Sequence, residues 1–378
     1  MLAGAALVDG SLTGPVVLTV VDGGITSIQE PHGDVAADAS ADLVVPGLLD
    51  VHTHGAEGVQ VIDGPTADLE RLAIFYAEHG VTGFLATVGG SRQRLLDGVT
   101  AVRAYLDGSS RAGARCLGIH LEGPFISPMA PGAFPPETVL APDQQLFEKL
   151  LAAAGGHLRL VTIAPEAPGA VAVIDLALLH GVTCSIGHSV ATADQVTRAV
   201  DAGARSVTHL FNAMAPFHHR EPGLVGTALT DDRLVCEVVA DGVHVHPAAV
   251  RLAVRAKGVA GIALVTDSIA ATGLPDGHYE LEDQLVTVTE GAARLADGTL
   301  AGSVLTLDRA VENLATWAGI PWIDAVRAAT EVPAALIGMA AERGTISVGR
   351  AADLAAFDAD HHLQWTMVGG ELHPAGTT

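Results

Sequence analysis

Eight short apolar runs alternate with helical patterns through the middle of this 378-residue chain, and this alternation constrains the fold more than any other feature. The runs lie near residues 48–52, 81–87, 116–121, 158–164, 182–187, 206–208, 235–240 and 262–266. Helices are expected at about 66–79, 91–107, 143–155, 168–180, 192–202, 247–257, 307–318 and 321–338. Repeated β and α units of this kind predict an α/β fold, a (β/α)8 TIM barrel.

The two ends of the chain predict a second, smaller β structure. Residues 2–45 alternate apolar and polar side chains between turn signals such as Asp22-Gly23-Gly24, which predicts a small antiparallel sheet, and residues 344–368 show the same pattern. Neither piece is large enough to bury a core alone, so we expect a discontinuous β-sandwich domain built from both termini. The expected division is 1–46 and 341–378 for the β domain and 47–340 for the barrel, with an inserted hairpin at about 279–300.

Composition excludes several classes of partner. Acidic residues outnumber Lys plus Arg by 43 to 20, and a net charge of −23 argues against nucleic acid or an anionic membrane as a partner. No apolar run reaches the roughly 18 residues that span a bilayer, and the first residues predict a β-strand rather than a signal peptide. Cys116, Cys184 and Cys236 all fall in predicted strands, so we expect core thiols in a reducing, cytoplasmic protein.

Side chains that can bind metals or move protons follow six of the eight predicted strands. They are His52 and His54 after the first strand, Glu122 after the third, and His188, His209, His244 and Asp267 after the fifth to the eighth. In a barrel of this type the C-terminal ends of the strands meet at one mouth, where the active site lies. We therefore expect these residues to face a common point.

Three of these side chains form a predicted metal site. Glu122, His188 and His209 supply three protein ligands and leave a position open, as catalytic divalent metal sites require. In His52-Thr53-His54 the two imidazoles are two residues apart on an extended chain and can face one metal. Taken singly, His188 and His209 are each also consistent with an ordinary structural role. The pair His52 and His54 is also consistent with two polar residues that merely end a strand.

Two further side chains are candidates for the chemistry and for recognition. Asp267 ends an apolar run, no clear helix follows it, and it is the candidate base that takes a proton from water activated by the metal. Arg220 lies among cationic donors in His218-His219-Arg220 and suits a phosphate, although a surface salt bridge with Glu221 is equally consistent with the local sequence.

With these residues in place, the chain resembles the amidohydrolase superfamily over essentially its whole length, and within it the deacetylases of N-acetylated amino sugar phosphates. The segments that carry the resemblance are 46–55 (PGLLDVHTHG), 120–125 (HLEGPF), 187–189 (GHS), 208–214 (THLFNAM), 220–223 (REPG), 240–244 (ADGVH), 265–267 (VTD), 300–303 (LAGS) and 349–354 (GRAADL). The resemblance implies hydrolysis of N-acetylglucosamine 6-phosphate to glucosamine 6-phosphate and acetate, in amino-sugar catabolism or recycling.

The same resemblance implies a role for individual residues. Glu122, His188 and His209 hold the principal metal, and Asp267 is the acid and base. Substrate contacts fall on Ala133, Asn212, Ala213, Arg220, His244, Leu300, Ala301 and Gly302. Because His52 and His54 are both present, a second metal is expected, with Glu122 as the bridge. Zn²⁺ is the expected metal, and Fe²⁺, Mn²⁺ or Co²⁺ also suit such ligands. A homodimer or homotetramer is implied, with substrate contacts that can cross the interface.

One departure from the resembled pattern leaves the substrate open. Where many relatives carry a histidine in the substrate loop, this chain reads Gly132-Ala133-Phe134, and Phe134 has no hydrogen-bond donor. Either His218 or His219 replaces that donor, or the substrate differs. The alternatives are another N-acyl amino sugar, such as N-acetylgalactosamine 6-phosphate or an unphosphorylated sugar, a cyclic amide, or a non-catalytic metal-binding sugar sensor.

Overall fold

Eight parallel strands form a barrel in the computed structural model, which describes residues 1–33, 36–62, 66–108, 112–281 and 284–376. The strands are β6 (Leu48–Thr53), β9 (Val81–Val88), β10 (Arg115–Glu122), β11 (Leu158–Ile163), β12 (Thr183–Ile186), β13 (Ser206–Val207), β14 (Val235–Val238) and β15 (Ile262–Leu264). Each pairs with the next in parallel, and all eight predicted strands are confirmed. The barrel nearly closes where β15 returns to β6, because Asp267 N donates to His52 O at 2.9 Å and His54 N donates to Ser268 O at 2.8 Å.

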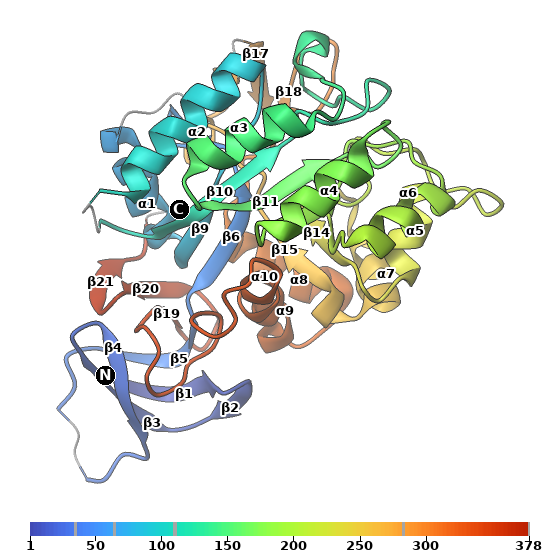
Figure 1. Ribbon diagram of the computed structural model, residues 1–378. Helices are drawn as coiled ribbons and strands as arrows, with labels where there is room; N and C mark the ends of the chain where they lie inside the picture. The colour runs from blue at the N-terminus through green and yellow to red at the C-terminus, as the bar shows by residue number, and fades with distance from the viewer. Residues whose placement is uncertain (34–35, 63–65, 109–111, 282–283, 377–378) are drawn as a thin grey trace.

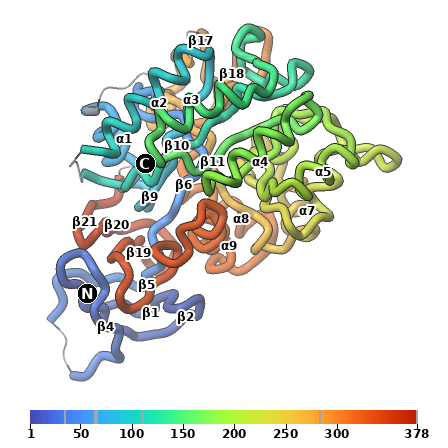
Figure 2. Tube along the Cα trace, viewed as in Figure 1, coloured from blue at the N-terminus to red at the C-terminus, as the bar shows by residue number. Residues whose placement is uncertain are grey.

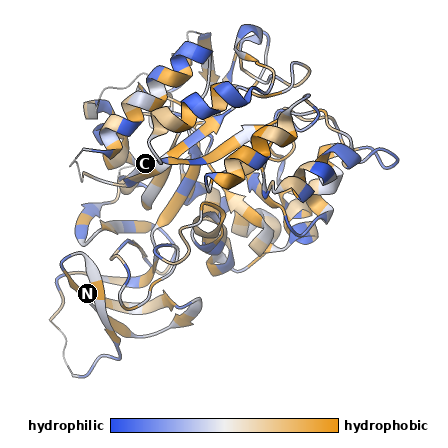
Figure 3. Cartoon of the chain, in the orientation of Figure 1, coloured by the Kyte–Doolittle hydropathy of each residue, from blue (hydrophilic) through white to orange (hydrophobic). Residues whose placement is uncertain are grey.

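Helices cover the outside of the barrel (Figure 1). They are α1 (Thr66–Glu78), α2 (Arg92–Leu106), α3 (Gln144–Ala154), α4 (Ala170–Leu179), α5 (Ala193–Ala202), α6 (Gly223–Thr230), α7 (Pro247–Lys257), α8 (Leu307–Ala318), α9 (Trp322–Ala328) and α10 (Glu331–Leu336). Short 3₁₀ turns cover Pro136–Thr138 and Val259–Gly261. Hydrophilic residues gather on the outer turns of these helices, while the strands are mostly apolar (Figure 3). No helix within the described ranges is long and apolar enough to cross a bilayer.

Both ends of the chain build one further sheet, as expected, in the order β21-β20-β19-β5-β1-β3-β4, with β2 paired to β1. Its strands are β1 (Leu2–Val8), β2 (Ser11–Thr13), β3 (Val16–Val21), β4 (Gly24–Gln29), β5 (Ser40–Pro46), β19 (Leu354–Phe357), β20 (Leu363–Val368) and β21 (Glu371–Pro374). The sheet encloses its own small core, which includes Leu18, Val44 and Leu354. Figure 2 shows the first and last segments of the chain side by side, and Gly376 N donates to Glu78 O at the end of α1, at 2.9 Å.

Three details of the N-terminal sheet and the helices differ from expectation. The N-terminal sheet is not wholly antiparallel. In the order β5-β1-β3-β4, the chain must cross the sheet from β4 to reach β5 on the far side of β1, and β1 and β5 run parallel. The helix expected at 321–338 is two helices, because the ring of Pro333 would clash with the Ala329 carbonyl one turn earlier. Helix α6 was not expected.

The insertion is also more than the hairpin expected at 279–300. It is a three-stranded sheet of β16 (Gly277–Leu281), β17 (Gln284–Thr289) and β18 (Ala292–Arg294). Residues 282–283 of the expected hairpin lie outside the described ranges. A two-stranded pair, β7 (Gly55–Ala56) and β8 (Val59–Gln60), follows the first barrel strand.

Candidate active site

The predicted metal-binding and proton-transfer residues meet at the C-terminal mouth of the barrel. Each lies at or just beyond the end of its strand, and the backbone turns sharply there. His188, His209 and Asp267 have φ values of 45°, 28° and 50°, in the left-handed region. Such conformations cost about 1–3 kcal/mol each in non-glycine residues and gather at functional sites, where the surrounding structure holds them.

Glu122, His188 and His209 form a compact, buried group. Glu122 Oε1 lies 3.1 Å from His188 Nε2 and 3.0 Å from His209 Nε2, and the two imidazole nitrogens are 3.0 Å apart. Nδ1 of His188 lies 3.1 Å from the carbonyl oxygen of Ala130, to which it can donate. That hydrogen bond leaves the lone pair of His188 Nε2 directed at Glu122.

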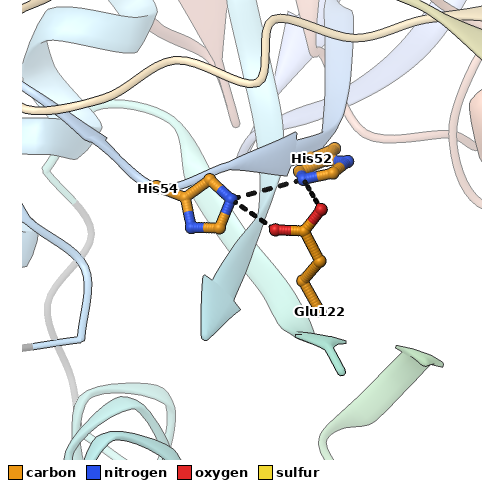
Figure 4. Close-up of side chains that lie close together, drawn as sticks. All are labelled: His52, His54 and Glu122. Atoms are coloured by element: carbon orange, nitrogen blue, oxygen red, sulfur yellow. Dashed lines mark hydrogen bonds and ion pairs between the residues drawn. The ribbon is translucent and has the colours of Figure 1, made fainter. Parts of the chain in front are cut away.

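His52, His54 and Glu122 form a second group that shares the carboxylate (Figure 4). His54 Nε2 lies 3.0 Å from Glu122 Oε2 and 3.3 Å from His52 Nε2, and His52 Nε2 lies 3.4 Å from Glu122 Oε1. Glu122 Oε1 therefore lies near His188, His209 and His52, while Oε2 lies near His54, so the carboxylate contacts both histidine pairs, as a bridging ligand would.

The donor set fits divalent cations. Tetrahedral ligands at about 2.0–2.1 Å from zinc stand roughly 3.4 Å apart, close to the separations within both groups. Burial raises the pKa of Glu122, but the charge of His52 and the hydrogen bonds from His188 and His209 hold that pKa well below its usual range. Burial lowers the pKa of His52, but the charges of Glu122 and Asp267 raise it well above its usual value. The carboxylates that favour a proton on these imidazoles equally favour a metal cation between them.

Asp267 borders both the metal-binding groups and the open cavity. Its Oδ1 lies 3.5 Å from His52 Nε2 and 3.4 Å from His54 Nε2, and its Oδ2 lies 3.9 Å from His244 Nε2. His244 Nδ1 donates to Asp241 Oδ2 at 2.7 Å. Burial lowers the pKa of His244, but the hydrogen bond and charge of Asp241 raise it above its ordinary value, which favours a proton on Nε2 facing the cavity.

A single cavity collects most of the residues proposed for substrate. Its walls include His54, Glu122, Ala133, His188, His209, Asn212, Ala213, His244, Asp267, Leu300 and Gly302. His52 and Ala301 are fully buried and do not line it. Arg220, His218 and His219 are exposed and do not line it either, and Arg220 Nη1 lies 2.9 Å from His219 Nε2.

Close packing explains two glycines of this cavity. A Cβ on Gly132, whose φ is +61°, would lie 2.9 Å from His188 Cε1, and one on Gly302, at φ +66°, would lie 2.3 Å from Ile269 Cγ2. Phe134 also lines the cavity, with its ring 5.3 Å from that of His188 in an edge arrangement. The inserted sheet supplies Gln284, whose Nε2 donates to Ala133 O at 2.7 Å and so ties the insertion to the substrate loop.

Sequence reasoning missed two carboxylates behind the site, Glu237 and Asp241. Glu237 lies within β14, fully buried, with Oε2 3.1 Å from His52 Nδ1. The available signal was a single charge inside the apolar run 235–240. Asp241 lies in the segment 240–244, and its spacing of three residues from His244 is the signal that their side chains can pair.

Comparisons with known proteins agree with this geometry. A sequence model of the amidohydrolase family matches residues 43–374. The N-acetylglucosamine-6-phosphate deacetylase of Bacillus subtilis (strain 168) is 38% identical over 361 residues, 93% of this chain and 91% of that protein. The N-acetylgalactosamine-6-phosphate deacetylase of Escherichia coli O157:H7 is 37% identical over 355 residues, 94% of each.

A solved structure is similar over the same length. It is a mutant N-acetyl-D-glucosamine-6-phosphate deacetylase from Mycobacterium smegmatis in complex with N-acetyl-D-glucosamine-6-phosphate. The two chains superpose with a TM-score of 0.93 at 34% identity, covering 99% of this chain and 98% of that one.

Proposed function

This chain belongs to the amidohydrolase family, and from that premise we propose that it hydrolyses N-acetylglucosamine 6-phosphate to glucosamine 6-phosphate and acetate. The observation that carries the proposal is the pair of groups sharing Glu122, with Asp267 beside them at the wall of one cavity. Relatives that align over nine-tenths of the chain carry the name of this activity.

The mechanism follows from which atoms face the cavity. Glu122, His188 and His209 would hold a divalent cation, which would polarise the acetyl carbonyl as a Lewis acid and lower the pKa of water. Asp267 accepts a proton as water adds to the carbonyl carbon, and His244 donates a hydrogen bond to the developing oxyanion. When the C–N bond breaks, Asp267 returns the proton to the departing amine, so acetate and a free amino sugar leave.

The finer assignments belong to the same proposal. We assign Zn²⁺ as the metal, with Fe²⁺, Mn²⁺ and Co²⁺ as alternatives, and a second cation at His52, His54 and Glu122. Ala133, Asn212, Ala213, Leu300 and Gly302 line the cavity and bind the sugar, with the buried Ala301 holding Leu300 and Gly302 in place, and Arg220 binds the phosphate. We further propose a homodimer or homotetramer in the cytoplasm, in which 1–46 and 341–378 form one domain and 47–340 the other. Buried thiols at Cys184 and Cys236 suit a reducing compartment.

A second candidate is N-acetylgalactosamine 6-phosphate. The Escherichia coli relative named for that substrate is almost as similar as the one from Bacillus subtilis. Phe134 lines the cavity and has no hydrogen-bond donor to offer a sugar hydroxyl group, so the stereochemistry of the sugar ring is the feature in question.

Acetate release from four sugars tests the proposal. Purified protein is assayed on N-acetylglucosamine 6-phosphate, N-acetylgalactosamine 6-phosphate and both unphosphorylated sugars, with and without a chelator. Chelator-sensitive release that favours N-acetylglucosamine 6-phosphate is the expected result. Faster acetate release from N-acetylgalactosamine 6-phosphate would make that sugar the proposed substrate. If the metal-loaded protein released no acetate from any of the four sugars, the proposed function would be overturned.

A further inference from the structure

Glu237 is a buried carboxylate that the mechanism above does not use. It belongs to strand β14, and its side chain has no exposed surface. Its Oε2 lies 3.1 Å from Nδ1 of His52 and accepts from the backbone N of His209 at 3.4 Å. Its Oε1 is buried with no hydrogen-bond partner among the described residues. Within those residues its one charged contact is His52.

We propose that Glu237 is a positioning residue for the second cation position, the one bounded by His52, His54 and Glu122. The inference rests on the proposed function in requiring that this position take a cation. A neutral imidazole carries one proton, on Nδ1 or on Nε2. By accepting a hydrogen bond from Nδ1–H, Glu237 keeps the proton on Nδ1 and leaves the lone pair of His52 Nε2 directed at Glu122 and His54, whose nearest atoms are 3.4 and 3.3 Å away.

The histidines of the first group, His188 and His209, are held differently. Nδ1 of His188 donates to a neutral carbonyl, that of Ala130, and Nδ1 of His209 has no partner within the described residues. A full negative charge behind the ring therefore belongs to His52, which is a ligand of the second position and not of the first. A carboxylate in this place raises the basicity of its imidazole as well as fixing the ring. Glu237 should thus act selectively, on the second cation.

Metal counting on three proteins tests the inference. Wild type, Glu237→Gln and Glu237→Ala are titrated with Zn²⁺ against a competing chelator, and bound metal is counted by elemental analysis. Glutamine can still accept from Nδ1 but carries no charge, so it isolates the contribution of charge, while alanine removes the hydrogen bond too. Wild type should bind two equivalents. Both variants should bind the second about 10–100-fold more weakly, alanine the more so, and keep the first unchanged.

The matched control is Asp308→Asn, which removes a largely buried acid outside both groups and should leave both affinities unchanged. Three results would each overturn the inference: Glu237→Ala binds both Zn²⁺ equivalents as tightly as wild type, it binds both equally more weakly, or wild type binds only one Zn²⁺ equivalent. Metal counting involves no substrate, so absence of deacetylation with selective loss of the second cation would refute the proposed function alone.

A measurement on the unmodified chain covers the case in which both variants fail to fold. In ¹⁵N-histidine-labelled, Zn²⁺-loaded wild type, long-range ¹H–¹⁵N spectra report which ring nitrogen of His52 carries the proton. The His52 signals are those lost in His52→Asn. A proton on Nδ1 is expected, and a proton on Nε2 or an unprotonated Nδ1 would overturn the inference.

Discussion

Asp267 joins the two halves of the proposed chemistry because each of its oxygens faces a different partner. Oδ1 lies against the imidazoles of His52 and His54, and Oδ2 faces His244 across the cavity. Its side chain is 11% exposed, enough to meet water but little enough to keep bulk solvent from competing for the proton. This placement suits a group that takes a proton on one step and returns it on the next.

Replacing Asp267 by asparagine should therefore lower turnover without emptying the metal site. We expect kcat to fall by about 10²–10⁴-fold, the usual contribution of general acid–base catalysis, with metal content and substrate affinity close to wild type. Stopped acetate assays, elemental analysis and calorimetric binding check the three quantities. The exposed Asp232→Asn is the control and should behave as wild type. Comparable turnover of Asp267→Asn and wild type would remove Asp267 from the mechanism.

At this scale the sequence predicted the residues that end strands and missed the ones inside them. His52, Glu122 and Asp267 could be found because strand ends converge in any barrel of this type. Glu237 could not, because its role depends on which face of β14 points inward and on the neighbour His52, 185 residues away. The spacing of residues along the chain does not predict which side chains of β14 point inward or which distant residue they meet. For Arg220 the sequence predicted the chemistry of the side chain, while its distance from the cavity depends on the path of the loop.

An ion pair joins the end of helix α1 to the start of helix α8. His79, just after α1, lies 3.6 Å from Asp308 in the first turn of α8. Burial raises the pKa of Asp308. The ion pair with His79 and the hydrogen bonds from the Thr306 hydroxyl and the Arg309 backbone N–H together lower it by more, so the pKa lies below its usual value. The folded protein therefore holds the Asp308 carboxylate more firmly than the unfolded chain does.

Stability supplied by Asp308 should depend on pH in one direction. It is present above the unfolded pKa near 4 and is lost as pH falls through the lower folded value. Asp308→Asn should thus lower the free energy of unfolding by about 1–2 kcal/mol at pH 7, and the difference from wild type should shrink below about pH 4. Urea denaturation across pH checks it, with the exposed Glu312→Gln on the same helix as control. A difference that grows on acidification would contradict the assignment.

Elements were predicted where apolar periodicity alone decides the structure. All eight barrel strands coincide with the expected runs to within a residue or a few at either end, because each is largely buried on both faces. Helix α6 escaped notice because Gly223 and Gly226 are poor helix formers, and the barrel supplies the packing that holds them. The parallel pairing of β1 with β5 was missed because alternation sets the faces of a strand and says nothing about its direction.

For the whole molecule, the metal groups connect distant parts of the chain. Glu122, His188 and His209 come from three separate β/α units, so a cation held by all three binds the folded chain and not the unfolded one. Zn²⁺ at about 100 times its dissociation constant should add about 2.7 kcal/mol of stability and raise Tm by a few degrees. Calorimetry with and without chelator checks the shift. His188→Asn should reduce the shift, because only the cation at His52, His54 and Glu122 would still bind, and the exposed His32→Asn should keep it in full; an unchanged Tm on chelation of a loaded protein would contradict the ligand set.

The placement of Arg220 bears on how copies of the chain cooperate. The segment before α6 extends away from the barrel (Figure 1), and Arg220 is exposed there beside His219 and the 57%-exposed Phe217. An arginine that does not line its own cavity can still bind the phosphate of a substrate in a neighbouring copy. In a homodimer with sites shared in this way, Arg220→Ala should raise KM for the phosphorylated sugar and leave that for the plain sugar unchanged.

Mixing two impaired variants then shows whether Arg220 acts in its own subunit's site or in that of a neighbouring copy. Subunits carrying Arg220→Ala and Asp267→Asn, unfolded together and refolded, form hybrids in which one site has an intact Asp267 from one copy and an intact Arg220 from the other. Random reassortment into dimers should restore roughly a quarter of wild-type activity at low substrate concentration. Each variant refolded alone gives the baseline. Activity equal to the mean of the two baselines would place Arg220 in its own subunit's site, and wild-type kinetics for Arg220→Ala would remove it from the phosphate altogether.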